Sequence, residues 1–262
     1  MKRIWKCYLL ETLLLIYASA SVCFADKDAV TLRVAAYNVE FSKSATAEQI
    51  GEMFKPFNLD VIGFNEAPDG HWTKRVGKVL GMGHSHVGKI SSANHKDKYK
   101  TILSRFPLEE KGEISLKGVG WNPASAVKAV IRKNGIPITF YSLHICGSKK
   151  DKGHAHFLAT EVLPKEKSEC VIVAGDFNNR VGDDSLNFVE GAGMRPTWKD
   201  LKIELSQNFS YNAFAPEKQA GVIDHIFYKV SSGARATDGG IIELRKPLSD
   251  HKPVWAELVF SR

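Results

Sequence analysis

The segment Cys170-Val-Ile-Val-Ala174, followed at once by Gly175-Asp176-Phe177-Asn178, holds the most information about the fold of this chain. Five apolar residues in a row predict a buried strand, and glycine with aspartate ends it abruptly. Because side chains alternate along extended backbone, Asp176 and Asn178 should point the same way from one strand end. Ordinary turns also favour Asp and Asn, so this segment alone leaves a turn and a functional site both open.

Two further apolar runs are interrupted by acidic residues. One strand is expected to end in Ser249-Asp250-His251, and another contains Val222-Ile223-Asp224-His225-Ile226. Three such interruptions in one chain are more than the turn preference of aspartate explains. They indicate residues placed for chemistry at strand ends.

Length and composition indicate a single globular domain. The chain has 262 residues, of which 44% are apolar and 25% are charged, enough to bury most of its surface in one core. No stretch of the body approaches the roughly 20 apolar residues needed to span a bilayer. We assign residues 26–262 to this domain.

The N-terminus has the layout of a secretory signal peptide. Three basic residues within residues 1–6 precede an apolar stretch at residues 13–17, and small residues follow at 18–21. This order predicts a signal peptide, assigned to residues 1–25 with cleavage after Ala20 or after Ala25, and a secreted or periplasmic protein. A short N-terminal membrane anchor is the alternative, although the apolar stretch is short for a span.

The chain is basic. Its net charge is +7, and removal of residues 1–25 takes away three positive charges and one negative charge, which leaves +5. A moderate positive excess suits an anionic partner, but many soluble proteins share it. The charge therefore permits a polyanionic substrate without identifying one.

The expected strand directions argue against a disulfide between Cys146 and Cys170, although exported proteins favour such bonds. Cys146 follows His144 beyond its strand, whereas Cys170 starts the strand that ends at Asp176. If both strands end at one edge, about 20 Å of extended chain separates the two cysteines. A disulfide needs Cα atoms within about 7 Å, so we expect two free thiols.

Apolar periodicity predicts strands alternating with helices along the body of the chain. Strands are expected at residues 32–37, 59–64, 99–103, 124–131, 138–145, 170–174, 222–226 and 254–260, with a weak strand near Ile241. Helices are expected after the capping box that begins at Thr46, after Asp69, around residues 153–163, and after Gly182. This order predicts an α/β protein with helices covering sheets.

Polar residues at the ends of these strands suit the chemistry of a phosphate ester. They are Asn38, Glu66, His144, Asp176, Asn178, Asp224, Asp250 and His251. Carboxylate and amide oxygens suit Mg²⁺, with Mn²⁺ or Ca²⁺ as alternatives. Imidazoles can transfer protons near neutral pH, and a carboxylate such as Asp224 can orient one of them. Together they can direct water at a phosphate ester.

Seven short motifs in order resemble those of the endonuclease/exonuclease/phosphatase superfamily, which includes deoxyribonuclease-I-like nucleases, inositol polyphosphate 5-phosphatases, bacterial sphingomyelinases and the B subunit of cytolethal distending toxin. The motifs are Tyr37-Asn38-Val39, Asn65-Glu66, Ser104-Arg105-x-Pro107, Leu143-His144, Gly175-Asp176-Phe177-Asn178, Ile223-Asp224-His225-Ile226 and Ser249-Asp250-His251-x-Pro253. The resemblance implies a four-layer α/β sandwich of two packed mixed β-sheets flanked by helices. Residues 26–262 would then be the catalytic domain.

The resemblance also implies a role for each motif residue. Glu66 would be the principal ligand of Mg²⁺, with Asn38 beside it and Asp250 completing the shell of metal or water. Asp176 and Asn178 would position the attacking water and the phosphate. His251, paired with Asp224, would act as general base or stabilise the pentacovalent phosphorus. His144 would protonate or hydrogen-bond the leaving oxygen, and Asp97 is a candidate to orient it.

Substrate contacts are expected from basic residues near these motifs. Arg105, Lys149 and Lys150, together with Asn178, are assigned to substrate binding, and a second run contains Lys96, Lys98 and Lys100. Basic runs can contact a phosphate backbone. The pairs His84 with His86 and His154 with His156 lack further ligands at zinc-site spacing, so packing or surface roles are expected. His225 should face away from the site.

Three functions remain open on this evidence. The first, which the sequence favours, is a secreted Mg²⁺-dependent phosphodiesterase, an endonuclease acting on nucleic acid. The second is an inositol phosphate or phosphoinositide phosphatase, or a sphingomyelinase-like hydrolase, on the same scaffold. The third is a toxin-like binding subunit in which catalysis is secondary or lost. A monomer or a subunit of a secreted complex is expected.

Overall fold

The computed structural model describes residues 29–147, 152–230 and 233–260, so the expected signal peptide lies outside the described residues. The described chain forms two six-stranded sheets. Neighbouring strands of the first sheet are, in order, β11 (Arg235–Ile241), β12 (Val254–Phe260), β1 (Val30–Asn38), β2 (Val61–Ala67), β4 (Tyr99–Ser104) and β3 (His84–Val87). Those of the second sheet are β5 (Glu109–Leu116), β6 (Ala124–Lys133), β7 (Ile136–His144), β8 (Val171–Asp176), β10 (Asp224–Lys229) and β9 (Met194–Pro196).

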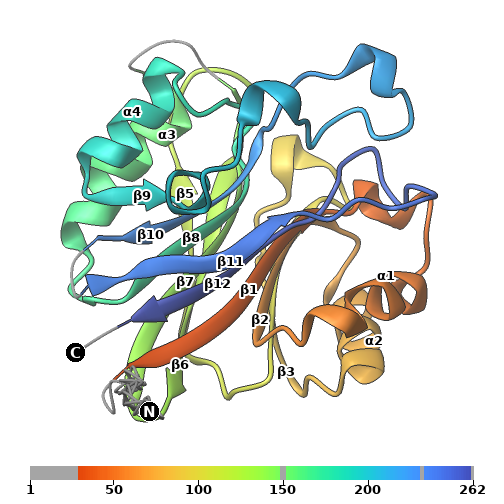
Figure 1. The fold of residues 1–262 in the computed structure, drawn as a ribbon, viewed down its shortest axis with the longest axis horizontal. Coiled ribbons are helices and arrows are strands. Elements are labelled where there is room, and N and C mark those ends of the chain that lie inside the picture. The colour runs from red at the N-terminus through yellow and green to blue at the C-terminus, as the bar shows by residue number, and fades with distance from the viewer. Residues whose placement is uncertain (1–28, 148–151, 231–232, 261–262) are drawn as a thin grey trace, which may run out of the picture.

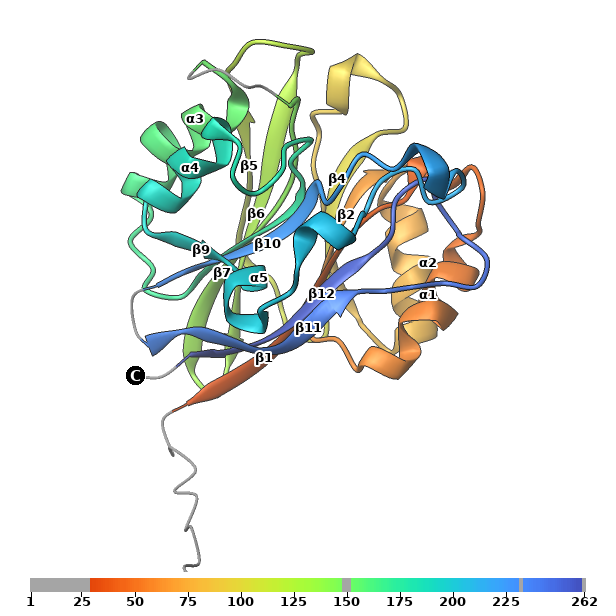
Figure 2. The ribbon, with the colours of Figure 1, turned by 45° about the horizontal axis from the view of Figure 1, so that its top comes forward.

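Helices cover the outer face of each sheet (Figure 1, Figure 2). The first sheet carries α1 (Ala47–Phe54) and α2 (Gly70–Leu80), and the second carries α3 (His154–Phe157) and α4 (Asp184–Gly191). A π-helical turn, Leu158–Val162, extends α3, and a short α5 (Thr197–Leu201) packs against β11 and β10. The predicted four-layer sandwich of two mixed sheets is therefore confirmed.

Alternation of side chains along the strands explains how the layers pack. In β1, Val30, Leu32 and Val34 point into the apolar core between the two sheets. Ala35 and Tyr37, on the opposite face of the same strand, join the core beneath α1 and α2. Because successive side chains of a strand point to opposite faces, one strand contributes to both cores and joins the layers.

The predicted helix starts are confirmed. Thr46 Oγ1 accepts a hydrogen bond from the Gln49 backbone N–H (3.3 Å), and Gln49 Oε1 accepts one from the Thr46 N–H (2.8 Å), which completes a capping box at α1. Asp69 Oδ1 accepts from the Trp72 N–H (2.6 Å) at the start of α2. These side chains satisfy backbone N–H groups that have no partner inside the helix.

Strand pairing separates the two cysteines, as expected. β7 and β8 are parallel, with Thr139 beside Val171 and His144 beside Asp176. Cys146 therefore lies near the His144 end of the sheet and Cys170 near the other end. Cys146 and Cys170 do not form a disulfide with each other, which confirms that prediction. In the part of the chain that the structure describes, no helix is long and apolar enough to cross a membrane.

Candidate active site

Strand directions bring the predicted residues to one edge of the sandwich. β1 and β2 are parallel and end side by side, with Asn38 opposite Asn65. In the second sheet, β10 is antiparallel to β8, so Asp224 lies opposite Asp176. Asp224 therefore begins its strand rather than interrupting it. Asp250 and His251 lie in the loop before β12, not at the end of a strand as expected.

Gly175 is required by the backbone that precedes Asp176. Its φ is +147°, and a Cβ atom at this position would collide with the carbonyl oxygen of Leu143 on the neighbouring strand. Glycine has no Cβ and adopts such backbone without strain. The glycine thus allows β8 to approach β7 at the point where the aspartate enters the site.

Asp176 is the centre of the site and is 1% exposed. Its Oδ2 accepts a hydrogen bond from Asn38 Nδ2 (3.0 Å) and lies 3.4 Å from His144 Nε2 and 3.7 Å from His251 Nε2. Its Oδ1 accepts from the Asn178 backbone N–H (2.9 Å). Burial raises the pKa of Asp176 to about 7, against the opposing charge of His251. One carboxylate thus faces both imidazoles.

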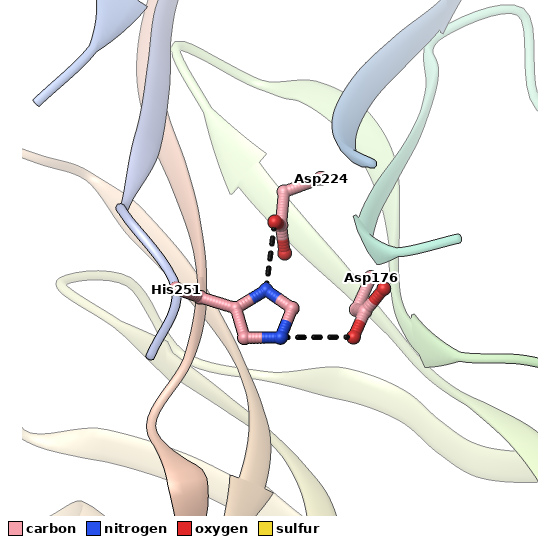
Figure 3. Close-up of side chains that lie close together, drawn as sticks. All are labelled: Asp176, Asp224 and His251. Carbon is pink, nitrogen blue, oxygen red and sulfur yellow. Dashed lines mark hydrogen bonds and ion pairs between the residues drawn. The ribbon is translucent and has the colours of Figure 1, made fainter. Parts of the chain in front are cut away.

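His251 lies between two aspartates (Figure 3). Its Nδ1 is 2.9 Å from Asp224 Oδ2, and its Nε2 faces Asp176. Burial lowers the pKa of the imidazole, but the charges of Asp224 and then Asp176 outweigh burial and raise it to about 10. The pair with Asp224 fixes the orientation of the ring, and Nδ1–H donates the hydrogen bond.

His144 is held in a different electrostatic setting. Burial, followed by the charges of Lys100, His251 and Lys98, lowers its pKa well below the ordinary value, so the ring is neutral. Its Nε2 lies 3.4 Å from both Asp176 Oδ2 and Asn178 Nδ2. The two imidazoles of the site thus have opposite pKa shifts, which is typical of groups with different roles in acid–base chemistry.

The structure corrects the prediction that Asp97 orients His144. Within the described residues, His144 Nδ1 has no hydrogen-bond partner, which excludes a bond from Asp97. The carboxylate that faces this nitrogen is Glu66, whose Oε1 lies 3.9 Å away. Glu66, not Asp97, is the acid beside this ring.

A bulge in β2 turns Glu66 toward the cleft. The pairing of β2 with β4 shifts register between Phe64 and Ala67, and Glu66 has φ +52°. Bulges re-aim side chains beside active sites, and positive φ in a non-glycine residue is uncommon. Glu66 Oε2 forms an ion pair with Lys98 Nζ at 2.8 Å. The principal predicted metal ligand therefore points into the cleft.

The other predicted oxygen ligands lie at the same edge. Asn38 Oδ1 accepts a hydrogen bond from the Glu40 N–H (3.1 Å). Ser249 donates its hydroxyl to the Asn38 carbonyl (2.8 Å) and to Asp250 Oδ1 (3.2 Å), which ties the β12 loop to β1. Burial raises the pKa of Asp250. Asn38, Glu66 and Asp250 all line one cleft.

Asn178 is placed by an unusual backbone conformation. It has φ +49°, a region that asparagine tolerates better than most residues. Its Nδ2 donates to the Ile145 carbonyl (2.9 Å). This hydrogen bond holds the amide beside His144.

Asn65 has a role at the site that the sequence did not reveal. It is fully buried, and its Oδ1 accepts from the backbone N–H of Asp176 (2.9 Å), while its Nδ2 donates to Ser142 Oγ (3.4 Å). These bonds run from the first sheet to the second. The position of Asn65 beside Glu66 indicated a polar contact. Its partner, Asp176, could not be predicted because it lies 111 residues away in the sequence.

The site opens into a cleft of about 480 Å³. The lining includes three aromatic residues that the sequence did not single out, Phe41, Trp121 and Tyr211. The Tyr211 ring lies 4.9 Å from His251 and the Trp121 ring 4.9 Å from His144, measured between centroids. Each imidazole therefore has an aromatic side chain beside it. A larger cavity of about 810 Å³, at the Cys170 end of the second sheet, contains none of these groups.

Arg105 does not lie at the site. β4 is antiparallel to β2, so the Ser104 end of β4 lies beside Val61, at the edge opposite Glu66. There Arg105 donates to the carbonyls of Leu59 (2.6 Å) and Leu80 (3.4 Å). The assignment of Arg105 to substrate binding is therefore wrong, and its contacts are structural.

The structure describes the basic run of Lys96, Lys98 and Lys100, but not the lysines assigned to substrate binding. Lys149 and Lys150 lie outside the described residues. Lys98 is paired with Glu66, and Lys100 is fully buried, with Nζ donating to the Ile90 carbonyl (2.6 Å). Lys100 is therefore not available as a phosphate contact, whereas Lys98 lines the cleft as the partner of Glu66 and Lys96 is exposed.

His225 and His156 have packing roles, whereas His95 lines the cleft. His225 Nδ1 accepts from Trp198 Nε1 (2.9 Å), so its Nε2–H donates to the Asn179 carbonyl (2.8 Å). This fully buried ring points away from the cleft, as predicted. His156 packs edge-on against Phe188 of α4.

The donor set fits a divalent cation. Four carboxylates, from Glu40, Glu66, Asp176 and Asp250, line the described cleft against a single lysine, Lys98. Such a lining would repel an anionic ester unless a cation were held there. Hard oxygen donors suit Mg²⁺, Mn²⁺ or Ca²⁺.

A second cluster that could hold a metal consists of Asp176, Asp224 and His251, whose ligand atoms lie within 4.8 Å of one another. In the structure, Asp224 Oδ2 and His251 Nδ1 are engaged with each other. We therefore favour the oxygen donors around Glu66 for the cation, with the three-residue cluster as an ion-pair network.

Comparisons with known proteins agree with this picture. An endonuclease/exonuclease/phosphatase family protein from Bacteroides thetaiotaomicron has 22% identity and a TM-score of 0.70, over 89% of this chain and 96% of that one. A mannosyl-6-phosphatase from the same species has 23% identity and a TM-score of 0.68, over 87% and 100%. TDP2 from D. rerio, complexed with a single-stranded DNA product, has 17% identity and a TM-score of 0.67, over 87% and 98%. Curated proteins provide no match.

A buried aspartate between two imidazoles, beside oxygen donors for a cation, suits the hydrolysis of a phosphate ester. The family model described as "Endonuclease/Exonuclease/phosphatase family" matches residues 35–251. The chain belongs to this family, whose members are phosphoester hydrolases and are generally dependent on divalent metals.

Proposed function

We propose that this chain is a Mg²⁺-dependent hydrolase that cleaves a phosphate ester by attack of water. The observation that carries the proposal is the position of Asp176, whose Oδ2 faces His144 at 3.4 Å and His251 at 3.7 Å within one buried site. A group that contacts both imidazoles is placed to orient a nucleophile between them.

Glu66, Asp250 and Asn38 would hold the cation. When bound, Mg²⁺ supplies positive charge that neutralises the phosphate oxygens. The cleft has more carboxylates than lysines, so a bound cation would also offset the negative charge of the protein there. Mn²⁺ is the alternative that the same oxygen donors accept.

The protein's own side chains divide the remaining work. Asp176 and the Asn178 amide hold the attacking water and the phosphate. His251, fixed by Asp224, directs Nε2–H toward the charge that develops on the phosphoryl oxygens. His144, neutral and buried, hydrogen-bonds the leaving oxygen from the opposite side of Asp176. Positioned donors that need no reorganisation lower the barrier most.

A compact phosphate monoester, such as a sugar or inositol phosphate, is the substrate class that we favour. Lys98 is engaged with Glu66 and Lys100 is buried, so Lys96 is the one exposed lysine of this run and offers little for the grip of a polyanionic backbone. The solved mannosyl-6-phosphatase with the same fold supports this choice.

Endonuclease activity on nucleic acid is the second candidate. The positive net charge, +5 once residues 1–25 are removed, favours it, and the TDP2 structure complexed with single-stranded DNA has the same fold. The basic residues Lys149 and Lys150 would then contact the phosphate backbone, because protein cations that replace counterions supply most non-specific affinity.

We further propose that the protein is exported after removal of residues 1–25, on the basis of the N-terminal sequence pattern. Expression of the full chain with a C-terminal tag, followed by N-terminal sequencing of the exported product, tests this step. A product that retains Met1 and stays in the membrane fraction would favour the anchor instead.

One parallel assay tests the activity. Purified mature protein with Mg²⁺ is offered mannose 6-phosphate, an inositol phosphate, supercoiled plasmid and single-stranded DNA, with His251→Gln as the inactive control. Release of inorganic phosphate from the monoesters is the expected result. Plasmid nicking without phosphate release would select the nuclease instead, and no cleavage of any substrate would refute the proposed hydrolysis.

A further inference from the structure

Trp121 forms one wall of the cleft directly beside His144. It lies in the segment between β5 and β6, at residues 117–123. The centroids of its ring and the His144 imidazole are 4.9 Å apart, with an interplanar angle of 63°. The indole lines the same cleft as Asp176 and Asn178. An organic group attached to the leaving oxygen at His144 would therefore meet this ring.

The segment that carries Trp121 is fixed to the active-site edge by His154. This histidine is fully buried, and its Nδ1 accepts from the backbone N–H of Cys146 (3.1 Å). Its Nε2–H therefore donates to Asn122 Oδ1 (3.2 Å). The ring thus joins the chain just after His144 to the residue just after Trp121. Both ring nitrogens are used, so a neutral imidazole serves as a fixed link.

Further contacts hold the segment in one shape. Asn122 Nδ2 donates to the carbonyls of Gly118 (3.0 Å) and Gly120 (3.1 Å), and the Val119 N–H donates to the Lys152 carbonyl (2.9 Å). Gly120 has φ +106°, and a Cβ there would collide with Cys146 Sγ. Because this network already fixes the Trp121 segment, little conformational entropy is lost there when a ligand binds.

We propose that Trp121 is a specificity-determining residue, which stacks on a ring in the organic part of the substrate, and that His154 is its positioning residue. The inference rests on the proposed function and narrows it to phosphate esters of ring-bearing alcohols, such as sugars or inositols. An indole face offers apolar and π contact to the C–H face of a ring and little to a short acyclic alcohol.

Two matched substrates test the assignment. Mannose 6-phosphate and glycerol 1-phosphate present the same phosphomonoester, but only the first carries a ring. Trp121→Ala should lower kcat/KM for the ring substrate about 10-fold or more, mainly through KM, the size of one lost stacking contact. The effect on glycerol 1-phosphate should be under about 3-fold, and Trp121→Phe should restore the preference for the ring substrate.

Control variants separate substrate contact from damage to the loop. Val119→Ala alters the same segment at a side chain that is 47% exposed and outside the cleft lining, so it should leave both substrates unaffected. His154→Ala should reproduce the ring-selective loss. Its effect should not add to that of Trp121→Ala in the double variant, since both act through one contact.

The outcomes distinguish this inference from the function on which it rests. If wild-type protein hydrolyses both monoesters and Trp121→Ala weakens them equally, the ring contact is wrong and the hydrolase stands. Full additivity of the His154 and Trp121 variants would refute the positioning role alone. If no monoester is hydrolysed, the proposed substrate class and the ring contact fall together.

Discussion

Asp224 Oδ2 and His251 Nδ1 are 2.9 Å apart, although Asp224 begins a strand of the second sheet and His251 lies in a loop of the first. The site therefore exists only when the two sheets are packed together. Asn65 and Asp176 make a second connection of the same kind, at 2.9 Å. Packing of the sandwich is thus what sets the geometry of the catalytic groups, and single-residue changes at the sheet junction should alter activity before they alter the fold.

Replacement of Asp224 by Asn tests this pair. The amide keeps the size of the side chain but removes the charge that orients and protonates His251. We expect kcat to fall about 10²–10⁴-fold, the usual contribution of a positioned acid–base group, with an unchanged melting profile. His225→Gln, one residue further along β10 and outside the cleft, is the control and should retain turnover per folded molecule. Equal losses in both variants would refute the pairing.

Glu66→Gln tests the cation site without relying on turnover. The Glu66 carboxylate points into the cleft and carries the charge that a hard cation requires. Isothermal titration of the metal-free protein with Mg²⁺ should show affinity weakened by at least about 10-fold. Glu52→Gln, in an exposed ion pair with Lys55 on α1, should bind Mg²⁺ like the wild type. Unchanged affinity in the Glu66 variant would place the cation elsewhere.

The strands and helices could be predicted because their signals are local. β12 spans Val254–Phe260 as its apolar run predicts, and Thr46 and Asp69 cap their helices through neighbours three residues away. The edge strand β5 escaped prediction because half of its residues are exposed and half are charged. The strand β9 has only three residues, too few for a periodic pattern.

The site could be predicted as a set of residues but not as a geometry. Lys98 and Lys100 look like a solvated basic run, yet the partner of Lys98 is Glu66, and the backbone around Ile90 folds over Lys100. Arg105 belongs to a motif near the site in sequence order, but the antiparallel run of β4 carries it to the opposite edge. Trp121 had no local signal, since its neighbours in the site come from other strands.

His225 should make stability depend on pH. Burial lowers its folded-state pKa to about 4, below the ordinary value of 6.5. Between pH 6.5 and 4 the unfolded chain therefore binds a proton that the folded chain excludes, so stability is full above pH 6.5 and falls as the pH drops toward 4. Each such group contributes a slope of up to about 1.4 kcal/mol per pH unit.

Urea unfolding at pH 7.5 and pH 5 measures this slope. His225→Gln should be less stable than the wild type at pH 7.5, because two buried hydrogen bonds are disturbed, but should lose less stability between the two pH values. His84→Gln, at an exposed position, should keep the wild-type difference. An identical pH dependence in wild type and His225→Gln would show that this ring does not exclude the proton.

Gly175→Ala should affect the protein more than any exposed glycine substitution, because two penalties coincide at one position. The backbone φ of +147° is strained for a residue with a Cβ, and the added Cβ meets the Leu143 carbonyl on β7. Non-glycine residues in such regions cost about 1–3 kcal/mol, and the collision must in addition push β8 away from β7. That movement would shift Asp176 relative to His144, so activity should fall further than the folded fraction does.

Gly83→Ala is the matched control, since Gly83 is exposed and a Cβ there meets nothing within 4 Å. Urea unfolding and phosphate release on the same samples separate the two effects: a Gly175 variant as stable and active as Gly83→Ala would mean that the close approach of β7 and β8 does not set the position of the aspartate.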